Sequence, residues 1–182
     1  MHVRSVLMVV FVCATSVVAA AQRYVPAYER DSTYNIEGGT ETLLIYFGGS
    51  FCGPCHDPEF KEALEQAKLM LVERAERKNE AFAAVGVALD LDVEEGLAFL
   101  RDAGRFDEFV VGRSWFNSAS LSRLWRPERP AGQVPGLPSV LVVERDMTMG
   151  AWGISASAPR YLAELTGTDE VIEWVEAGAP LE

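Results

Sequence analysis

Two cysteines separated by two residues are the side chains of this sequence best suited to chemistry. Cys52 and Cys55 follow the apolar run 43–47 and precede a long stretch with helical periodicity. Side chains at positions i and i+3 of a helix share a face, so two sulfurs at this spacing can form a disulfide with little backbone movement. A cysteine pair between a predicted strand and a predicted helix is typical of a redox site.

The expected start of the helix predicts different roles for the two cysteines. Cys52 would lie at the helix N-terminus, where unpaired N–H groups and the positive end of the dipole favour the reactive thiolate. Cys55 would lie one turn further along and more buried. We therefore predict that Cys52 is the nucleophile and Cys55 the resolving thiol. Between them lie Gly53 and Pro54, and Pro54 suits a first helical turn because it has no N–H.

Other uses of the pair stay open. A purely structural disulfide would stabilise the fold by only about 2 kcal/mol, because the closed loop is short. A structural zinc site needs about four ligands, and after residue 21 only His56 joins the two cysteines as a histidine or cysteine. The acidic cluster at 90–95 does not match a calcium loop, and a helix cap explains Asp92 and Glu95. We predict no metal and no cofactor.

A family resemblance can be stated on these residues. The segment Phe51-Cys52-Gly53-Pro54-Cys55-His56 resembles the active-site signature of the thioredoxin-like superfamily, which usually has Trp in place of Phe51. The second mark of that family is a cis-proline at the start of a later strand. Leu137-Pro138-Ser139, followed by the apolar run 140–143, matches this position. The resemblance implies a redox-active Cys52–Cys55 disulfide, a cis Pro138, and supporting roles for Phe51, Gly53, Pro54 and His56.

The resemblance also implies an activity, that of a thiol–disulfide oxidoreductase. The Cys52 thiolate would attack a protein disulfide, and Cys55 would then resolve the mixed disulfide. Gly53-Pro54 resembles the reducing branch of the family. A reductant in an oxidising compartment requires an electron donor, and we expect a membrane thiol reductase. Tyr46 lies near the position where thioredoxins carry a buried acid, and a phenol there argues against efficient general disulfide reduction.

Two other classes of function remain as alternatives. One is a dedicated metallochaperone or cytochrome-maturation partner, which would use the dithiol on a single client. The other is a redox-inert interaction module with a permanently closed disulfide. The breadth of the client set distinguishes the first from a general reductase, and the ease of reduction by dithiothreitol distinguishes the second.

The N-terminus predicts export. Residues 1–4 carry positive charge, residues 5–18 are mainly apolar, and Ala19-Ala20-Ala21 provides a cleavage site before Gln22. We therefore expect residues 1–21, which include Cys13, to be a signal peptide, and the bacterial periplasm to be the destination. A membrane anchor formed by uncleaved residues 5–21 is the alternative. The chain has 16 basic and 27 acidic residues, a net charge of −11, which argues against nucleic acid as a partner.

The remaining pattern predicts a single α/β domain over residues 40–182, after a lead-in at 22–39. Strands are expected at 41–47 and 82–89, and a hairpin at 139–144 and 148–152 around Arg145-Asp146-Met147. Helices are expected after Cys52, from Asp92 to Gly104, and at 168–177. Asp57-Pro58 predicts either a kink in the first helix or the cap of a second segment.

This order predicts a three-layer thioredoxin-like fold, with a central mixed sheet and helices on both faces. Its main departure is an insertion at about 105–134, before the cis-proline strand. We expect this insertion to form either a lip that selects clients or a satellite core around Trp115 and Trp125.

Overall fold

One mixed sheet forms the centre of the molecule. The computed structural model describes residues 22–30, 38–113 and 136–181. Within them the strand order is β3-β2-β1-β4-β5, and β6 also pairs with β4. The strands are β1 (Gly39–Gly48), β2 (Ala81–Ala88), β3 (Glu108–Val110), β4 (Ser139–Gly150), β5 (Gly153–Ala156) and β6 (Arg160–Thr166). The first three are mutually parallel, whereas β4 runs antiparallel to β1, β5 and β6.

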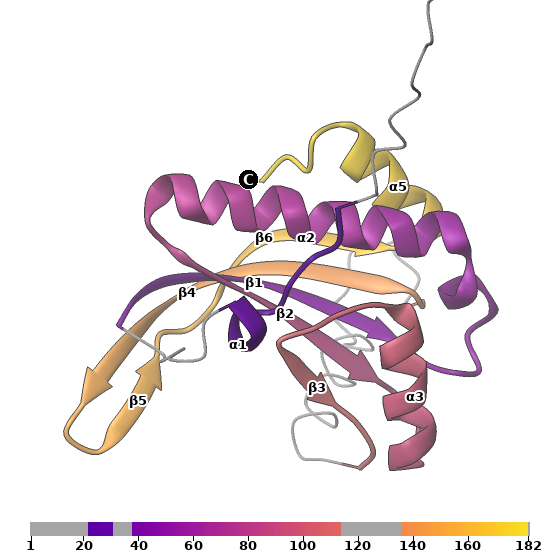
Figure 1. Cartoon of the computed structure of the whole chain (residues 1–182), viewed down its shortest axis with the longest axis horizontal. Helices are drawn as coiled ribbons and strands as arrows, with labels where there is room; N and C mark the ends of the chain where they lie inside the picture. Colours follow the sequence, from indigo (N-terminus) through magenta and orange to yellow (C-terminus); the bar gives the residue numbers. More distant parts are fainter. Residues whose placement is uncertain (1–21, 31–37, 114–135, 182) are drawn as a thin grey trace, which may run out of the picture.

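The described helices pack against this sheet (Figure 1). They are α1 (Ala27–Arg30), the 3₁₀ turn η1 (Gly53–His56), α2 (Pro58–Lys78), α3 (Val93–Ala103) and α5 (Thr168–Glu176). Side chains of α2, α3 and α5 join the larger buried cluster, while a second cluster is built from strand and loop residues. The order β1–α2–β2–α3, then β4–β6–α5, confirms the predicted α/β class and thioredoxin-like fold.

Helix α2 begins after the cysteines, at a cap of its own. The Asp57 side chain accepts a hydrogen bond from the Glu59 N–H at 2.8 Å, and Pro58 occupies the first turn. Of the two predicted arrangements, the second segment is therefore the correct one. The buried face of α2 contains the predicted apolar stripe of Phe60, Leu64, Ala67, Leu71 and Ala75.

The predicted hairpin around residues 145–147 is wrong, because β4 continues through them to Gly150. Arg145, Asp146 and Met147 are paired with Glu41, Thr40 and Gly39 of β1. The Arg145 guanidinium lies 2.7 Å from the Glu41 carboxylate, and Thr40 Oγ1 donates to Asp146 at 3.0 Å. These charged residues resembled a turn in the sequence, but cross-strand partners hold them in the sheet. The turn lies at Ala151 and Trp152.

Strand β6 was not predicted. Its pairing with β4 shifts register between Val142 and Val143, so that Val142 pairs with Ala163 and Val143 with Tyr161. The shift leaves Leu162 between the paired positions, and Leu162 and Leu165 are both buried at a spacing of three. A bulge of this kind interrupts the alternation by which a strand is recognised in a sequence.

The lead-in segment is fixed to the domain by Asp107. Its carboxylate accepts hydrogen bonds from the Tyr24 hydroxyl at 2.5 Å, from the Ala27 N–H at 2.7 Å and from the Ala84 N–H at 2.7 Å. One carboxylate therefore joins the segment before β1 to strand β2. Within the described part of the lead-in, residues 27–30 form the short helix α1.

Replacing this acceptor tests how strongly the lead-in is held. We expect Asp107→Asn to lower the free energy of unfolding by about 2–3 kcal/mol, because an amide NH₂ would face groups that donate. The control Tyr24→Phe removes a single donor and should cost about 1 kcal/mol. Urea denaturation measures both, and the double variant should lose less than the sum of the two. Equal losses for the two single variants would contradict this role of Asp107.

Candidate functional site

The strand register brings three loop segments together at one edge of the sheet. Gly48 at the end of β1 pairs with Ala88 at the end of the parallel strand β2. Phe47 pairs with Ser139, the first residue of the antiparallel strand β4. The residues that follow β1 and β2 therefore lie beside the residues that precede β4. This edge contains the cysteine pair, Asp90 and Pro138.

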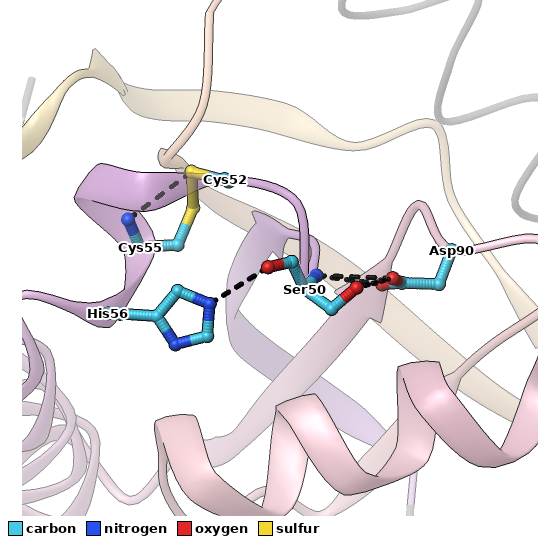
Figure 2. The surroundings of a disulfide bond; sticks show 5 residues. All are labelled: Ser50, Cys52, Cys55, His56 and Asp90. Atoms are coloured by element: carbon cyan, nitrogen blue, oxygen red, sulfur yellow. Dashed lines mark hydrogen bonds between the residues drawn. A yellow bond between two sulfur atoms is a disulfide. The ribbon is translucent and has the colours of Figure 1, made fainter.

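Cys52 and Cys55 form a disulfide in the structure, with their Cα atoms 5.3 Å apart (Figure 2). Cys55 is fully buried, and Cys52 retains 7% exposure. The Cys55 N–H donates to Cys52 Sγ at 3.2 Å. A hydrogen bond to this sulfur would favour the thiolate of Cys52 in the reduced protein. The difference in exposure and this bond both fit a nucleophilic Cys52 and a resolving Cys55.

The source of that stabilisation differs from the sequence prediction. Cys52 does not begin the long helix, because η1 contains only four residues and α2 starts at Pro58. Cys52 is instead the N-cap residue of the 3₁₀ turn η1, and Pro54 lies at the start of that turn. The main local stabilisation of a Cys52 thiolate therefore comes from the Cys55 N–H group. The long helix α2, with its dipole, begins six residues after Cys52.

A buried carboxylate holds the loop that leads into the cysteines. Asp90, 4% exposed, accepts the Ser50 N–H at 3.1 and 3.2 Å and the Ser50 hydroxyl at 2.5 Å (Figure 2). The Cys52 N–H closes the same loop by donating to the Gly49 carbonyl at 3.0 Å. From the sequence, we weighed Asp90 only as a possible cation ligand within the acidic cluster 90–95. Its position directly after the strand parallel to β1 was the signal for its contact with this loop.

His56 supports the same loop from the other side. Its Nε2 lies 3.0 Å from the Ser50 carbonyl oxygen, and because a carbonyl can only accept, Nε2 carries the proton (Figure 2). The ring edge packs against Phe99, with centroids 5.6 Å apart. Phe51 is 67% exposed, and Gly53 and Pro54 are also exposed. The surface around Cys52 is therefore open on the side of these three residues.

Pro138 directly precedes strand β4 and follows Leu137 through a cis peptide bond. This is the isomer that the family resemblance implies for this position. The Pro138 carbonyl accepts the Gly167 N–H at 2.8 Å, and the buried Ser139 hydroxyl donates to the Leu165 carbonyl at 3.0 Å. Both bonds connect the start of β4 to the end of β6. The proline therefore directly precedes a strand whose first residues are held by these bonds.

Tyr46 is buried below the site, within a group of aromatic side chains. Its ring lies parallel to that of Phe106 and also contacts Phe60 and Phe99. Burial raises the pKa of Tyr46 well above its ordinary value, and its hydroxyl has no hydrogen-bond partner among the described residues. The phenol therefore stays neutral at physiological pH and cannot take up a proton as a carboxylate would.

Several predictions concern residues outside the described ranges. The signal peptide or anchor within 1–21 is one, and the client lip or satellite core formed by Trp115 and Trp125 is another. In residues 22–30, 38–113 and 136–181, no group of three or more His, Cys, Asp or Glu side chains could hold a metal ion. No helix in those ranges is both long enough and apolar enough to cross a membrane.

Comparison with known proteins adds one loose structural likeness. No family model matches the sequence, and no curated protein matches it. Among solved structures, a chain from Chlorobium tepidum described as a thiol:disulfide interchange protein, DsbE, has 17% sequence identity and a TM-score of 0.39. The likeness covers 76% of this chain and 80% of that chain. Because the superposition is loose, the fold assignment rests on the strand order and on the position of the cis-proline.

The unpartnered Tyr46 hydroxyl can be tested directly. We expect Tyr46→Phe to leave the free energy of unfolding unchanged or to raise it by up to about 1 kcal/mol, because the lost hydroxyl makes no compensating bond. Tyr46→Ala, the control, should cost about 3–5 kcal/mol by leaving a cavity. Urea denaturation provides both values. A loss above about 1 kcal/mol in Tyr46→Phe would mean that the hydroxyl has a partner.

Proposed function

We propose that the chain is a thiol–disulfide oxidoreductase of the thioredoxin-like superfamily that acts through Cys52 and Cys55. The observation that carries the proposal is the setting of their disulfide. It lies at an edge of the sheet where a cis Pro138 directly precedes the adjacent strand, and an N–H group points at the sulfur of Cys52, the more exposed cysteine. A structural disulfide requires neither this proline nor this difference between the two sulfurs.

The proposed reaction begins from the dithiol. The Cys52 thiolate attacks one sulfur of a client disulfide, which forms a mixed disulfide and releases the other client sulfur as a thiolate that takes up a proton. Cys55 then loses its proton and attacks Cys52 Sγ. This step closes the Cys52–Cys55 disulfide and releases the second client thiol. Two electrons and two protons pass to the client, and the reverse sequence would oxidise it.

We further propose that the protein is exported and works as a reductant in the bacterial periplasm. The apolar residues 5–18 and the alanines before Gln22 support export, and Gly53-Pro54 supports the reducing direction. Because the surroundings would keep the pair oxidised, a membrane thiol reductase would have to supply the electrons. The clients would be protein disulfides.

One observation favours a more restricted role. Tyr46 occupies the buried position below the site and cannot accept the proton of Cys55 near neutral pH. The proton of Cys55 would then pass to an acceptor other than Tyr46, such as solvent or a group of the client. A dedicated partner that acts on a single client, such as a metallochaperone or a cytochrome-maturation protein, is therefore the second candidate.

The reduction potential tests the proposed direction. Equilibrated with glutathione at about −200 mV, the Cys52–Cys55 pair should be mostly oxidised, because a reducing couple lies well below that potential. Alkylation followed by mass spectrometry measures the reduced fraction. A mostly reduced pair at that potential would reverse the direction. Resistance to excess dithiothreitol would instead support the redox-inert module.

Mixed-disulfide trapping tests the two cysteine roles and the breadth of the client set. Cys55→Ser should accumulate mixed disulfides with clients, because the resolving thiol is missing. Cys52→Ser, the matched control, should accumulate far fewer. Non-reducing electrophoresis of cell extracts shows the adducts, and many bands indicate a general reductase while one band indicates a dedicated partner. Stronger trapping by Cys52→Ser would exchange the two assignments.

A further inference from the structure

A second feature of the molecule lies far from the cysteines, at the other end of β4. Beyond Met147, which pairs with Gly39, the strand has no pairing to β1 and continues with β5 as a two-stranded hairpin. Figure 1 shows this hairpin extending away from the rest of the sheet. Residues 147–156 are here called the arm. All four residues of β5 are exposed, and in the described structure β5 pairs only with β4.

The arm carries no charge. Residues 147–159 contain no Asp, Glu, Lys or Arg, although such residues make up 24% of the chain and leave it with a net charge of −11. Exposed edge strands are usually protected by charged residues or proline, which prevent contact with other surfaces. The absence of both from residues 147–156 indicates that contact at the arm is tolerated or used.

The register divides the arm into two faces. Met149 pairs with Ile154, and Met147 pairs with Ala156, so these four side chains share one face. The opposite face has only Thr148, Gly150, Gly153 and Ser155. At the tip, Trp152 is 101% exposed, while Met149 is 51% and Ile154 45% exposed. Trp152 belongs to neither buried cluster of the described residues, so its exposed indole is available for contact outside the domain.

We propose that the arm contacts a lipid bilayer of zwitterionic lipids, which have no net charge. Trp152, Met149 and Ile154 would lie at the level of the headgroups. An indole ring is apolar with one N–H donor and favours the boundary between headgroups and acyl chains. The free edge of β5 needs hydrogen-bonding partners, which headgroups and interfacial water provide and the hydrocarbon core does not. Thr148 and Ser155 suit the same polar layer.

The shape and charge of the arm favour lipid over a protein surface. A stable protein interface buries about 800 Å² on each partner, whereas the arm offers three large exposed apolar side chains on a projecting tip. A fluid surface needs no complementary pocket. The net charge of −11 disfavours anionic lipid. The uncharged arm can therefore approach a zwitterionic surface while the acidic remainder of the chain stays in water.

Vesicle binding by the full chain tests this proposal. Wild type should float with phosphatidylcholine vesicles, and Trp152→Ser should bind about tenfold more weakly, because the main interfacial side chain is lost. Leu91→Ser is the matched control, since Leu91 is a 69% exposed apolar residue outside the arm, and it should bind as wild type does. Binding should not weaken with added salt, because no charge takes part.

A second measurement separates the arm from residues 1–21, which all variants share. Brominated phosphatidylcholine should quench wild-type tryptophan fluorescence more than that of Trp152→Phe, and the difference reports Trp152 alone. Equal quenching, equal binding of wild type and Trp152→Ser, or no vesicle binding by wild type would each overturn the proposal. Arm-dependent self-association in sedimentation without vesicle binding would assign the arm to a second copy. Reduction of the disulfide should be the same in all variants, so this test does not depend on the proposed function.

Discussion

The pairing of β1 with β2 on one side and with β4 on the other is the constraint on which the site depends. Each of the three segments at the site is defined by a strand end: the loop after Gly48, Asp90 after β2, and Pro138 before β4. A shift of register by one residue would turn the side chains of a strand to the opposite face and separate these segments. The apolar residues of both sheet faces fix the register, so the packing of the core also positions the cysteines.

The polar groups near the cysteines mainly hold the backbone in place. Asp90 binds the Ser50 N–H and hydroxyl, and His56 donates to the Ser50 carbonyl. Ser50 is thus held through three of its polar groups, two positions before Cys52. Meanwhile Tyr46 provides a buried but neutral ring in the layer below. The geometry of the pair is therefore closely controlled, whereas proton transfer to and from Cys55 has no buried carboxylate at Tyr46 to assist it.

The sequence predicted those parts of the fold that depend on local patterns. The strands near 41–47 and 82–89, the apolar stripe of α2 and the Asp92 cap all follow from periodicity and capping residues. Three features depended on distant partners and were mispredicted or missed. Arg145 is held in β4 by Glu41, and Leu162 is displaced by a bulge. Asp90, after β2, accepts a hydrogen bond from Ser50, after β1. In each case the deciding contact joins residues 18 or more positions apart, which a local pattern does not encode.

Strand β4 connects the two proposed activities and separates them in space. It begins at Ser139, next to the cis-proline, and ends at Gly150, two residues before Trp152. Twelve residues of strand span at most about 40 Å at roughly 3.3 Å per residue. If the arm lies in the headgroup layer, this strand sets the distance at which the dithiol is held from the bilayer. The cysteines would then face the aqueous compartment, within reach of soluble protein clients and of the extended part of a membrane-bound electron donor.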